Sequence, residues 1–197
     1  GDVWNATITT NDGTMDGWKN WSNSLTIVAN AVPTQGTPIL NSSSGTNTSL
    51  ENLTVYNVST LDGDNDDVKN IINWYKDGSS ITVLNLPFEA DGSENASDYS
   101  GFGNNGTVTG STWNATGGYD SKGAFMFDGK DDLINIVDDG SLDITQEITL
   151  EAWIYPLTDQ PNAGVILRKV NSYEIYEHAG IVYGRIWNGS IQYSGDS

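Results

Sequence analysis

Alternating apolar and polar positions near the start of the chain predict a β-hairpin. Trp4, Ala6 and Ile8 fall on one face of an extended strand, and Asn-Asp-Gly at residues 11–13 signals a turn. Residues 24–30 then run back as a second apolar strand. The first thirty residues are therefore expected to form a strand, a turn and a returning strand.

The same period of two returns in the second half of the chain. Residues 148–155 alternate strictly, as a half-buried strand does. One face of this expected strand carries Ile148, Leu150, Ala152 and Ile154. Residues 185–193 predict a hairpin, because the pair Asn188-Gly189 fits a tight two-residue turn. Asn-Gly, Asp-Gly and Gly-Gly pairs separate most of these runs, so an all-β fold is expected.

The charge of the chain narrows the range of partners. Its 197 residues include 26 acidic and 8 basic side chains, which gives a formal net charge of −18. Such a surface repels nucleic acid phosphates and anionic membranes, and it offers oxygen ligands to hard cations. No apolar run approaches membrane-spanning length. We therefore expect no nucleic acid binding and no direct membrane insertion, and calcium is the cofactor that the charge favours.

Two residue types with useful chemistry are nearly missing. The chain has no cysteine and a single histidine, His178. The sequence therefore provides no disulfide and no thiolate nucleophile, and it excludes most zinc sites and a histidine-based proton relay. A secreted protein of this composition must be stabilised by core burial, bound ions or glycans.

Acceptor triplets for N-linked glycan, Asn-x-Ser/Thr, are dense. With 21 asparagines, chance predicts roughly four triplets, and the chain has ten. Asn, Ser and Thr also favour turns, which accounts for part of the excess. We interpret the density as that of an extracellular, N-glycosylated protein. The acceptors are Asn5, Asn20, Asn41, Asn47, Asn52, Asn57, Asn95, Asn105, Asn114 and Asn188.

Two stretches in the first half of the chain carry a resemblance. Gly-Asp-Val-Trp at residues 1–4 and the Ser-Asn and Thr-Ile pairs within residues 22–27 are similar to the closing strands of immunoglobulin-like repeats in large bacterial and archaeal surface proteins. Residues 50–78 resemble the opening strands of such a repeat. The resemblance implies a closing strand pair in residues 1–30 and opening strands in residues 31–83.

Four motifs follow one another in the second half. They are a Leu-Pro-Phe-Glu-Ala-Asp-Gly strand, an Asp-x-Ser-Gly-x-Gly-Asn-x-Gly loop, a Phe-Asp-Gly-x-x-Asp strand and a strand ending in Ala-Trp. Together they resemble a laminin G-like, concanavalin A-like jelly roll over residues 84 to about 156, and the resemblance implies a domain that spans residues 84–197. The family has further core strands, so the resemblance implies a jelly roll that is incomplete at its C-terminal end.

The order of the immunoglobulin-like strands implies an exchange. In the resembling repeats the opening strands come first, whereas here the closing pair precedes them. We therefore expect residues 1–30 to complete a neighbouring copy or an adjacent repeat by strand addition. Such a head-to-tail contact builds a filament when it does not close. A sheet between residues 1–30 and residues 50–83 of the same chain would contradict this expectation.

The jelly-roll resemblance also raises the question of glycoside hydrolysis. That reaction needs two carboxylates about 5 to 10 Å apart. Glu147 and Glu151 are the only pair on an expected strand, and four residues along a strand span roughly 13 Å. The hydrolase pattern also has an aspartate where this chain has Thr149. We therefore expect no enzymatic activity.

Two groups of residues are candidate calcium ligands. The first alternates along Asp-Gly-Asp-Asn-Asp-Asp and comprises Asp62, Asp64 and Asp66, for which a polar turn is the alternative reading. The jelly-roll resemblance implies a second group, for which hydrogen bonding across loops is the alternative. Its members are Asp98, Asn104, Asp128 and Asp131.

Two functions follow from these observations. The first is a structural or adhesive glycoprotein of a prokaryotic cell surface, with an archaeal one favoured, in a sheath, surface layer or filament. Its partners are copies of itself or adjacent repeats. The alternative is a secreted, calcium-dependent carbohydrate-binding module of a larger enzyme, with Trp153 and Tyr155 as an aromatic platform. The density of glycan acceptors favours the first function.

Overall fold

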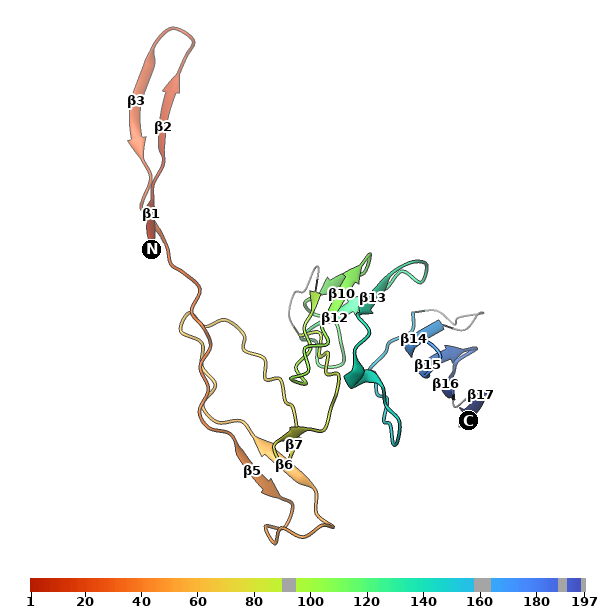
Figure 1. Cartoon of the computed structure of the whole chain (residues 1–197). Helices are drawn as coiled ribbons and strands as arrows, with labels where there is room; N and C mark the ends of the chain where they lie inside the picture. The colour runs from red at the N-terminus through yellow and green to blue at the C-terminus, as the bar shows by residue number, and fades with distance from the viewer. Residues whose placement is uncertain (90–94, 158–163, 188–190, 196–197) are drawn as a thin grey trace. The chain divides into compact units, whose positions relative to one another are not determined.

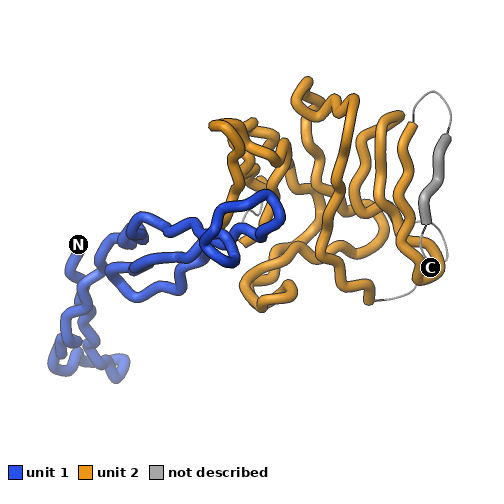
Figure 2. Tube along the Cα trace, turned by 90° about the horizontal axis from the view of Figure 1, so that it is seen from below, with its two compact units in different colours: residues 1–70 blue, residues 71–197 orange. Residues whose placement is uncertain are grey.

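The computed structural model describes residues 1–89, 95–157, 164–187 and 191–195 (Figure 1). The fold is all-β, as expected: the regular elements of these residues are strands, apart from one 3-10 helix of three residues, η1 (Gly140–Leu142). The chain divides into two compact units, residues 1–70 and residues 71–197 (Figure 2). No helix in the described ranges is long and apolar enough to cross a membrane.

The N-terminal hairpin is confirmed, and it contains four strands instead of two. Its outer ladder pairs β1 (Asp2–Trp4) with β4 (Leu25–Ile27), and its inner ladder pairs β2 (Thr7–Asn11) with β3 (Asp16–Trp21). The connecting turn is closed by the Asp12 carboxylate, which accepts hydrogen bonds from the following backbone N–H groups. Figure 1 shows the ladder of β2 and β3 as a two-stranded ribbon with no third strand beside it.

A second hairpin follows in the same unit. In it β5 (Ile39–Ser42) pairs with β6 (Leu53–Tyr56), and an isolated bridge between Thr34 and Leu61 extends the pairing toward the hairpin base. None of the strands within residues 1–30 pairs with a strand of residues 50–83, all of which the structure describes. The sheet that would have contradicted strand exchange is therefore not observed, and the exchange itself stays a prediction.

The described residues of unit 2 form two sheets and two short hairpins. The three-stranded sheet has the order β13-β10-β9 and consists of β9 (Asn95–Ala96), β10 (Gly106–Thr109) and β13 (Leu133–Ile136). The four-stranded sheet follows chain order and consists of β14 (Gly164–Lys169), β15 (Tyr173–His178), β16 (Ile181–Trp187) and β17 (Ile191–Gly195). The short hairpins pair β7 (Tyr75–Lys76) with β8 (Ser79–Ser80) and β11 (Thr112–Asn114) with β12 (Ala124–Met126).

Two predicted strands have different outcomes. The hairpin expected at residues 185–193 is confirmed by the pairing of β16 with β17, although its Asn188-Gly189 turn lies outside the described residues. The strand expected at residues 148–155 is wrong, because that segment forms none. Of the expected apolar face, Ile148 and Leu150 are half-buried, whereas Ala152 and Ile154 are exposed. A strand also needs a neighbour for its backbone groups.

The core of unit 2 is small and largely polar. Among the described residues only four apolar side chains are buried, namely Ala96, Leu142, Tyr173 and Tyr176. The buried polar and charged residues are Ser100, Asn104, Ser111, Glu174 and Glu177. Buried polar groups cost free energy unless they are hydrogen-bonded. The hydrogen-bond networks of unit 2 therefore carry much of its structural definition.

Candidate functional site

The loop with the Asp-x-Ser-Gly motif is organised around one carboxylate. Oδ1 of Asp98 accepts hydrogen bonds from the backbone N–H groups of Asn85 and Ser100, both at 2.9 Å. Its Oδ2 accepts from the Ser100 hydroxyl at 2.6 Å and the Asn104 N–H at 2.9 Å. Burial raises the pKa of Asp98, but these hydrogen bonds outweigh burial and hold it below its usual value. Two donors on each oxygen leave little room for a calcium ion.

Asn104 connects this loop to two distant segments. Its side chain is buried, and its Nδ2 donates to the Val83 carbonyl at 2.8 Å and to the Ser141 hydroxyl at 2.9 Å. Both amide protons are therefore used within the fold. The structure places Asp98 and Asn104 in a network that defines unit 2, and it groups neither of them with the acidic cluster at Asp128.

The same network reaches back to residues 71–83. Nδ2 of Asn73 donates to the Ser80 hydroxyl and to the Ser100 carbonyl, both at 3.0 Å. The Ser100 hydroxyl, which donates to Asp98, also lies 3.2 Å from the carbonyl of Val83, with which its one proton can be shared. These contacts explain why the second compact unit begins at Ile71 rather than at residue 84. The assignment of the segments to two families stays a prediction.

The first acidic cluster lies in a tight turn of unit 1. Carboxylate oxygens of Asp62, Asp64 and Asp66 lie within 4.8 Å of one another, so the structure brings together all three predicted ligands. The pKa of Asp64 lies below its usual value, first because of a hydrogen bond with the Asp62 side chain and then because of one from the N–H of Ala31. Three carboxylates in this arrangement offer the oxygen ligands that calcium prefers.

The turn itself explains the geometry equally well. Oδ1 of Asp62 accepts hydrogen bonds from the N–H of Asp64 at 3.0 Å and of Asp66 at 3.3 Å. Aspartate favours such local bonds to its own backbone. Asn65 between the two has a φ of 67°, in the left-handed region that asparagine tolerates. The polar-turn alternative and the cation site are thus compatible with the same backbone.

The second acidic cluster differs in membership from the prediction. Carboxylates of Asp128 and Asp131 lie within 4.8 Å of each other and of Asp132, which the sequence analysis did not single out. Asp132 also accepts a 2.7 Å hydrogen bond from the N–H of Asp128. The pKa of Asp128 is lowered, chiefly by a hydrogen bond from the Lys130 N–H. Lys130 pairs with Asp128 at 3.3 Å and therefore competes with any cation.

Most of the glycan acceptors are open to solvent. Asn114 is half-buried: its Oδ1 accepts from the Thr116 N–H and hydroxyl, and its Nδ2 lies 3.8 Å from the Met126 sulfur. Asn188 lies outside the described residues. The exposed acceptors are Asn5, Asn20, Asn41, Asn47, Asn52, Asn57, Asn95 and Asn105.

One carboxylate orders the loop between β5 and β6. Three predicted glycan acceptors lie in this loop or next to it. Glu51 accepts from hydroxyls of Ser44, Thr46 and Thr48, none of which is the third residue of a triplet. Its pKa lies well below its usual value, first because of a hydrogen bond from the Ser42 hydroxyl. The loop is therefore held without using the triplet hydroxyls. Asn47 and Asn52 lie in this loop, and Asn41 lies in β5 just before it.

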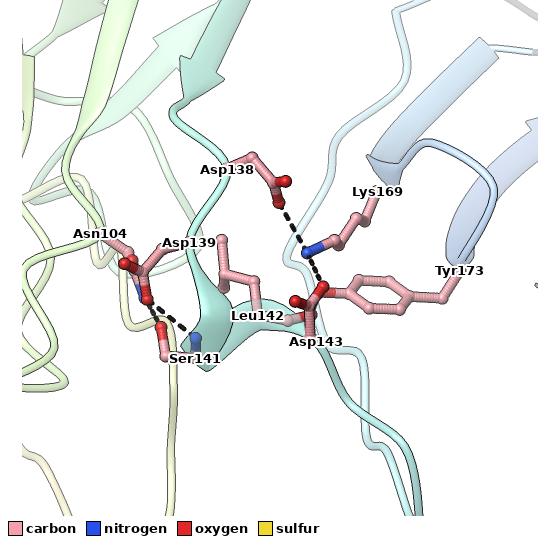
Figure 3. A network of polar contacts seen from close by, with 8 residues as sticks. All are labelled: Asn104, Asp138, Asp139, Ser141, Leu142, Asp143, Lys169 and Tyr173. Atoms are coloured by element: carbon pink, nitrogen blue, oxygen red, sulfur yellow. Dashed lines mark hydrogen bonds and ion pairs between the residues drawn. The ribbon is translucent and has the colours of Figure 1, made fainter.

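A clamp joins the four-stranded sheet to η1 (Figure 3). Lys169 of β14 reaches Asp138 at 2.7 Å and Asp143 at 2.5 Å, one on each side of the 3-10 turn. These hydrogen bonds raise the pKa of Lys169 well above its usual value. The hydroxyl of Tyr173 donates to the Leu142 carbonyl at 3.1 Å, and burial raises its pKa. The sheet is thus anchored at the edge strand β14.

Two exposed aromatic residues of the segment before β14, Trp153 and Tyr155, lie on the surface, and a ring from the β11–β12 loop stacks on the first of them. Tyr119 and Trp153 stack with ring centroids 4.8 Å apart, and their exposed fractions are 85% and 84%. Tyr155 is equally exposed. Glu147 and Glu151, the pair weighed for hydrolysis, are also exposed and lie on the part of the chain that forms no strand.

No family model matches the chain, and no curated protein or solved structure matches it. The immunoglobulin-like and laminin G-like assignments therefore stay predictions that rest on motif resemblance. The function has to be argued from the surfaces and clusters described above.

Proposed function

We propose that the chain is part of a structural or adhesive glycoprotein of a prokaryotic cell surface. In this proposal immunoglobulin-like strands in residues 1–83 precede a laminin G-like jelly roll in residues 84–197. Copies or adjacent repeats assemble head-to-tail, and the N-terminal hairpin adds its strands to a neighbour. The observation that carries the proposal is the exposure of this hairpin.

Every residue of the N-terminal hairpin is exposed, including Trp18 at 91% and Trp21 at 67%. Each of its two faces carries a large apolar side chain: Trp21 lies opposite Thr7, and Ile8, the residue after Thr7, points to the other side. A lone two-stranded hairpin is marginally stable in water, and its strands leave backbone groups unpaired. Strands and an apolar face from a neighbour would satisfy both needs.

Assembly of the full chain tests the proposal. A synthetic peptide of residues 1–30, added in excess, would occupy the acceptor position on each copy and end the polymer. We therefore expect shorter assemblies in sedimentation velocity and electron microscopy. A peptide with the same composition in scrambled order is the control. Polymers that are equally long with both peptides would contradict strand addition.

A substitution gives an independent check. Trp21→Ala removes a large apolar side chain from the hairpin. We expect the association constant to fall about tenfold, as for a central interface tryptophan. Met15→Ala is the matched control, because Met15 is 72% exposed but lies in the turn between β2 and β3. Equal association of the two variants would contradict a role for the hairpin strands.

Exposure of eight acceptors supports the glycoprotein part of the proposal. We expect glycopeptide mass spectrometry of the native protein to find sugar at several of them, with Asn47 and Asn105 occupied first because they lie in polar loops, whereas Asn41, which was expected in a loop, lies in strand β5. Native protein in which none of the ten acceptor asparagines carries sugar would contradict the glycoprotein part of the proposal. Calcium at the Asp62 cluster completes the proposal as a stabilising ion.

One observation favours the second candidate, a carbohydrate-binding module. The stacked pair of Tyr119 and Trp153 is the kind of exposed aromatic surface on which sugar rings pack. A glycan array separates the candidates: binding of the native chain to one polysaccharide, lost in Trp153→Ala, would favour the module. Tyr155→Ala is the matched control, since Tyr155 is as exposed but is not part of the stack.

A further inference from the structure

The two arginines of the four-stranded sheet lie in one row of charged residues that crosses three strands. Arg168 of β14 lies directly opposite Glu174 of β15, and Glu174 lies opposite Arg185 of β16. Residues opposite one another in an antiparallel pair project from the same face. These are both arginines of the chain, and His178, its only histidine, lies on the same face of β15.

The centre of the row is fixed by close contacts. Arg185 pairs with Glu174 at 2.9 Å, and its guanidinium lies 4.9 Å from the Tyr176 ring centre and 5.2 Å from that of Trp187. Tyr176 stacks on Tyr183 at 5.1 Å with an angle of 15° between the rings. Cation–π contacts and the ion pair together hold these side chains in one arrangement. Glu174 and Tyr176 are buried beneath this arrangement, whereas Arg168 is exposed and Tyr183, Arg185 and Trp187 are half-buried. We call the surface formed by Arg168, Tyr183, Arg185 and Trp187 the arginine face.

Arg168 is the free end of the row. It is exposed, and its side chain forms no hydrogen bond or ion pair with the described part of the chain. The three charged residues of the row sum to one positive charge, in a chain whose net charge is −18. The arginine face is thus a local exception to the acidic surface.

We propose that the arginine face docks the acidic surface of a second copy of this chain. The inference rests on the proposed assembly function and names a second contact surface for it. Tyrosine, tryptophan and arginine are the residues enriched at the centres of protein interfaces. The complementary charge is carried by the chain itself, whose two aspartate clusters are each built from three side chains. A basic face meeting an acidic one is a heterologous contact, which fits head-to-tail growth.

The test is charge reversal at the exposed end of the row, measured on the full chain. We expect Arg168→Glu to weaken association about tenfold, the loss typical of an interface arginine. Lys122→Glu is the matched control: Lys122 is exposed, and the substitution changes the net charge equally. Because overall repulsion rises by the same amount in both, equal association by sedimentation equilibrium would overturn the proposal.

Two further readouts keep this proposal separate from strand addition. If the hairpin contributes to assembly and the arginine face does not, Trp21→Ala weakens association, while Arg168→Glu associates as strongly as its control Lys122→Glu. If the hairpin fails and the arginine face holds, the pattern is reversed. Arg168→Lys keeps the charge and should retain part of the association. Loss of glycan binding in Arg168→Glu with assembly at the control level would also overturn the proposal, because it assigns the face to a sugar.

Discussion

The two units of the chain differ in burial and in the sequence range of the hydrogen bonds that hold their strands. Residues 1–70 contain no buried residue, and most of their hydrogen bonds close hairpins and turns, with a few longer-range contacts such as that from the Ala31 N–H to Asp64. Residues 71–197 bury few apolar side chains, yet Asp98, Asn104 and Lys169 connect segments that are far apart in the sequence. Long-range polar contacts define a fold even when the apolar core is small, whereas local ladders alone do not.

The largest expected difference between the two units is in the rate of amide hydrogen exchange. In the monomeric chain we expect backbone amides of β2 and β3 to exchange on the order of a hundredfold faster than those of β15, which pairs on both sides. In the assembled protein the amides of β2 and β3 should become protected. Equal protection of both units in the monomer would show that unit 1 is stable by itself.

Removal of the Asp98 charge should give the next largest effect. Asp98→Asn replaces an acceptor of four hydrogen bonds with an amide, and we expect unit 2 to lose about 2 kcal/mol of unfolding free energy. Urea denaturation measures this loss. Asp131→Asn, at an exposed carboxylate of the same unit, is the control and should change the stability little in the presence of chelator.

The pH dependence of Asp98 sharpens that prediction. The pKa of its carboxylate is lowered in the folded state, so its contribution is present above the unfolded pKa of about 3.9 and is lost as the pH falls. The stability difference between the native chain and Asp98→Asn should therefore shrink in acid. A difference that stays constant down to strongly acidic pH would assign the loss to packing instead.

Lys169 should act at the opposite end of the pH scale, with a smaller effect. Its pKa is raised in the folded state, so its contribution is complete below the unfolded pKa of about 10.4 and disappears as the pH rises through the folded value. We expect Lys169→Met to lower the melting temperature at neutral pH and to remove part of the alkaline loss of stability. Lys130→Met, at a largely exposed ion pair, serves as the control.

Chelation should have the smallest effect. A cation bound only by the folded state stabilises it by mass action, so excess chelator should lower the melting temperature of the native chain. The variant Asp62→Asn, Asp64→Asn, Asp66→Asn should show less of this shift. A melting curve that chelator leaves unchanged would favour the polar-turn alternative for both acidic clusters.

Sequence patterns were informative where the partner of a strand lies nearby. The N-terminal hairpin and the β16–β17 hairpin follow from alternation and turn residues, because both strands are adjacent in the chain. The failed strand at residues 148–155 has the same alternation without a nearby partner. Alternation describes the faces of an extended segment, and it carries no information about which backbone will pair with it.

The same distinction applies to the sites. Asp62, Asp64 and Asp66 come together because one turn holds them, which their spacing predicts. Asp98 and Asn104 were singled out by the jelly-roll resemblance. Which N–H and O–H groups donate to the Asp98 carboxylate, however, depends on residues as distant in sequence as Asn85. Asp132 could have been found from the doubled aspartate at residues 131–132. The arginine row depends on a register that shifts at the Val165/Leu167 irregularity, which no local pattern reveals.

Under the proposed glycosylation, the half-buried acceptor Asn114 would impose an order of events during biosynthesis. Its amide nitrogen, the atom that would carry the sugar, lies against Met126 once β11 and β12 have paired. Transfer to this asparagine would then precede closure of that hairpin, whereas the exposed acceptors would stay open to transfer afterwards. The ratio of sugar at Asn114 to sugar at Asn105 would then act as a clock, recording how much of the chain was modified before it folded.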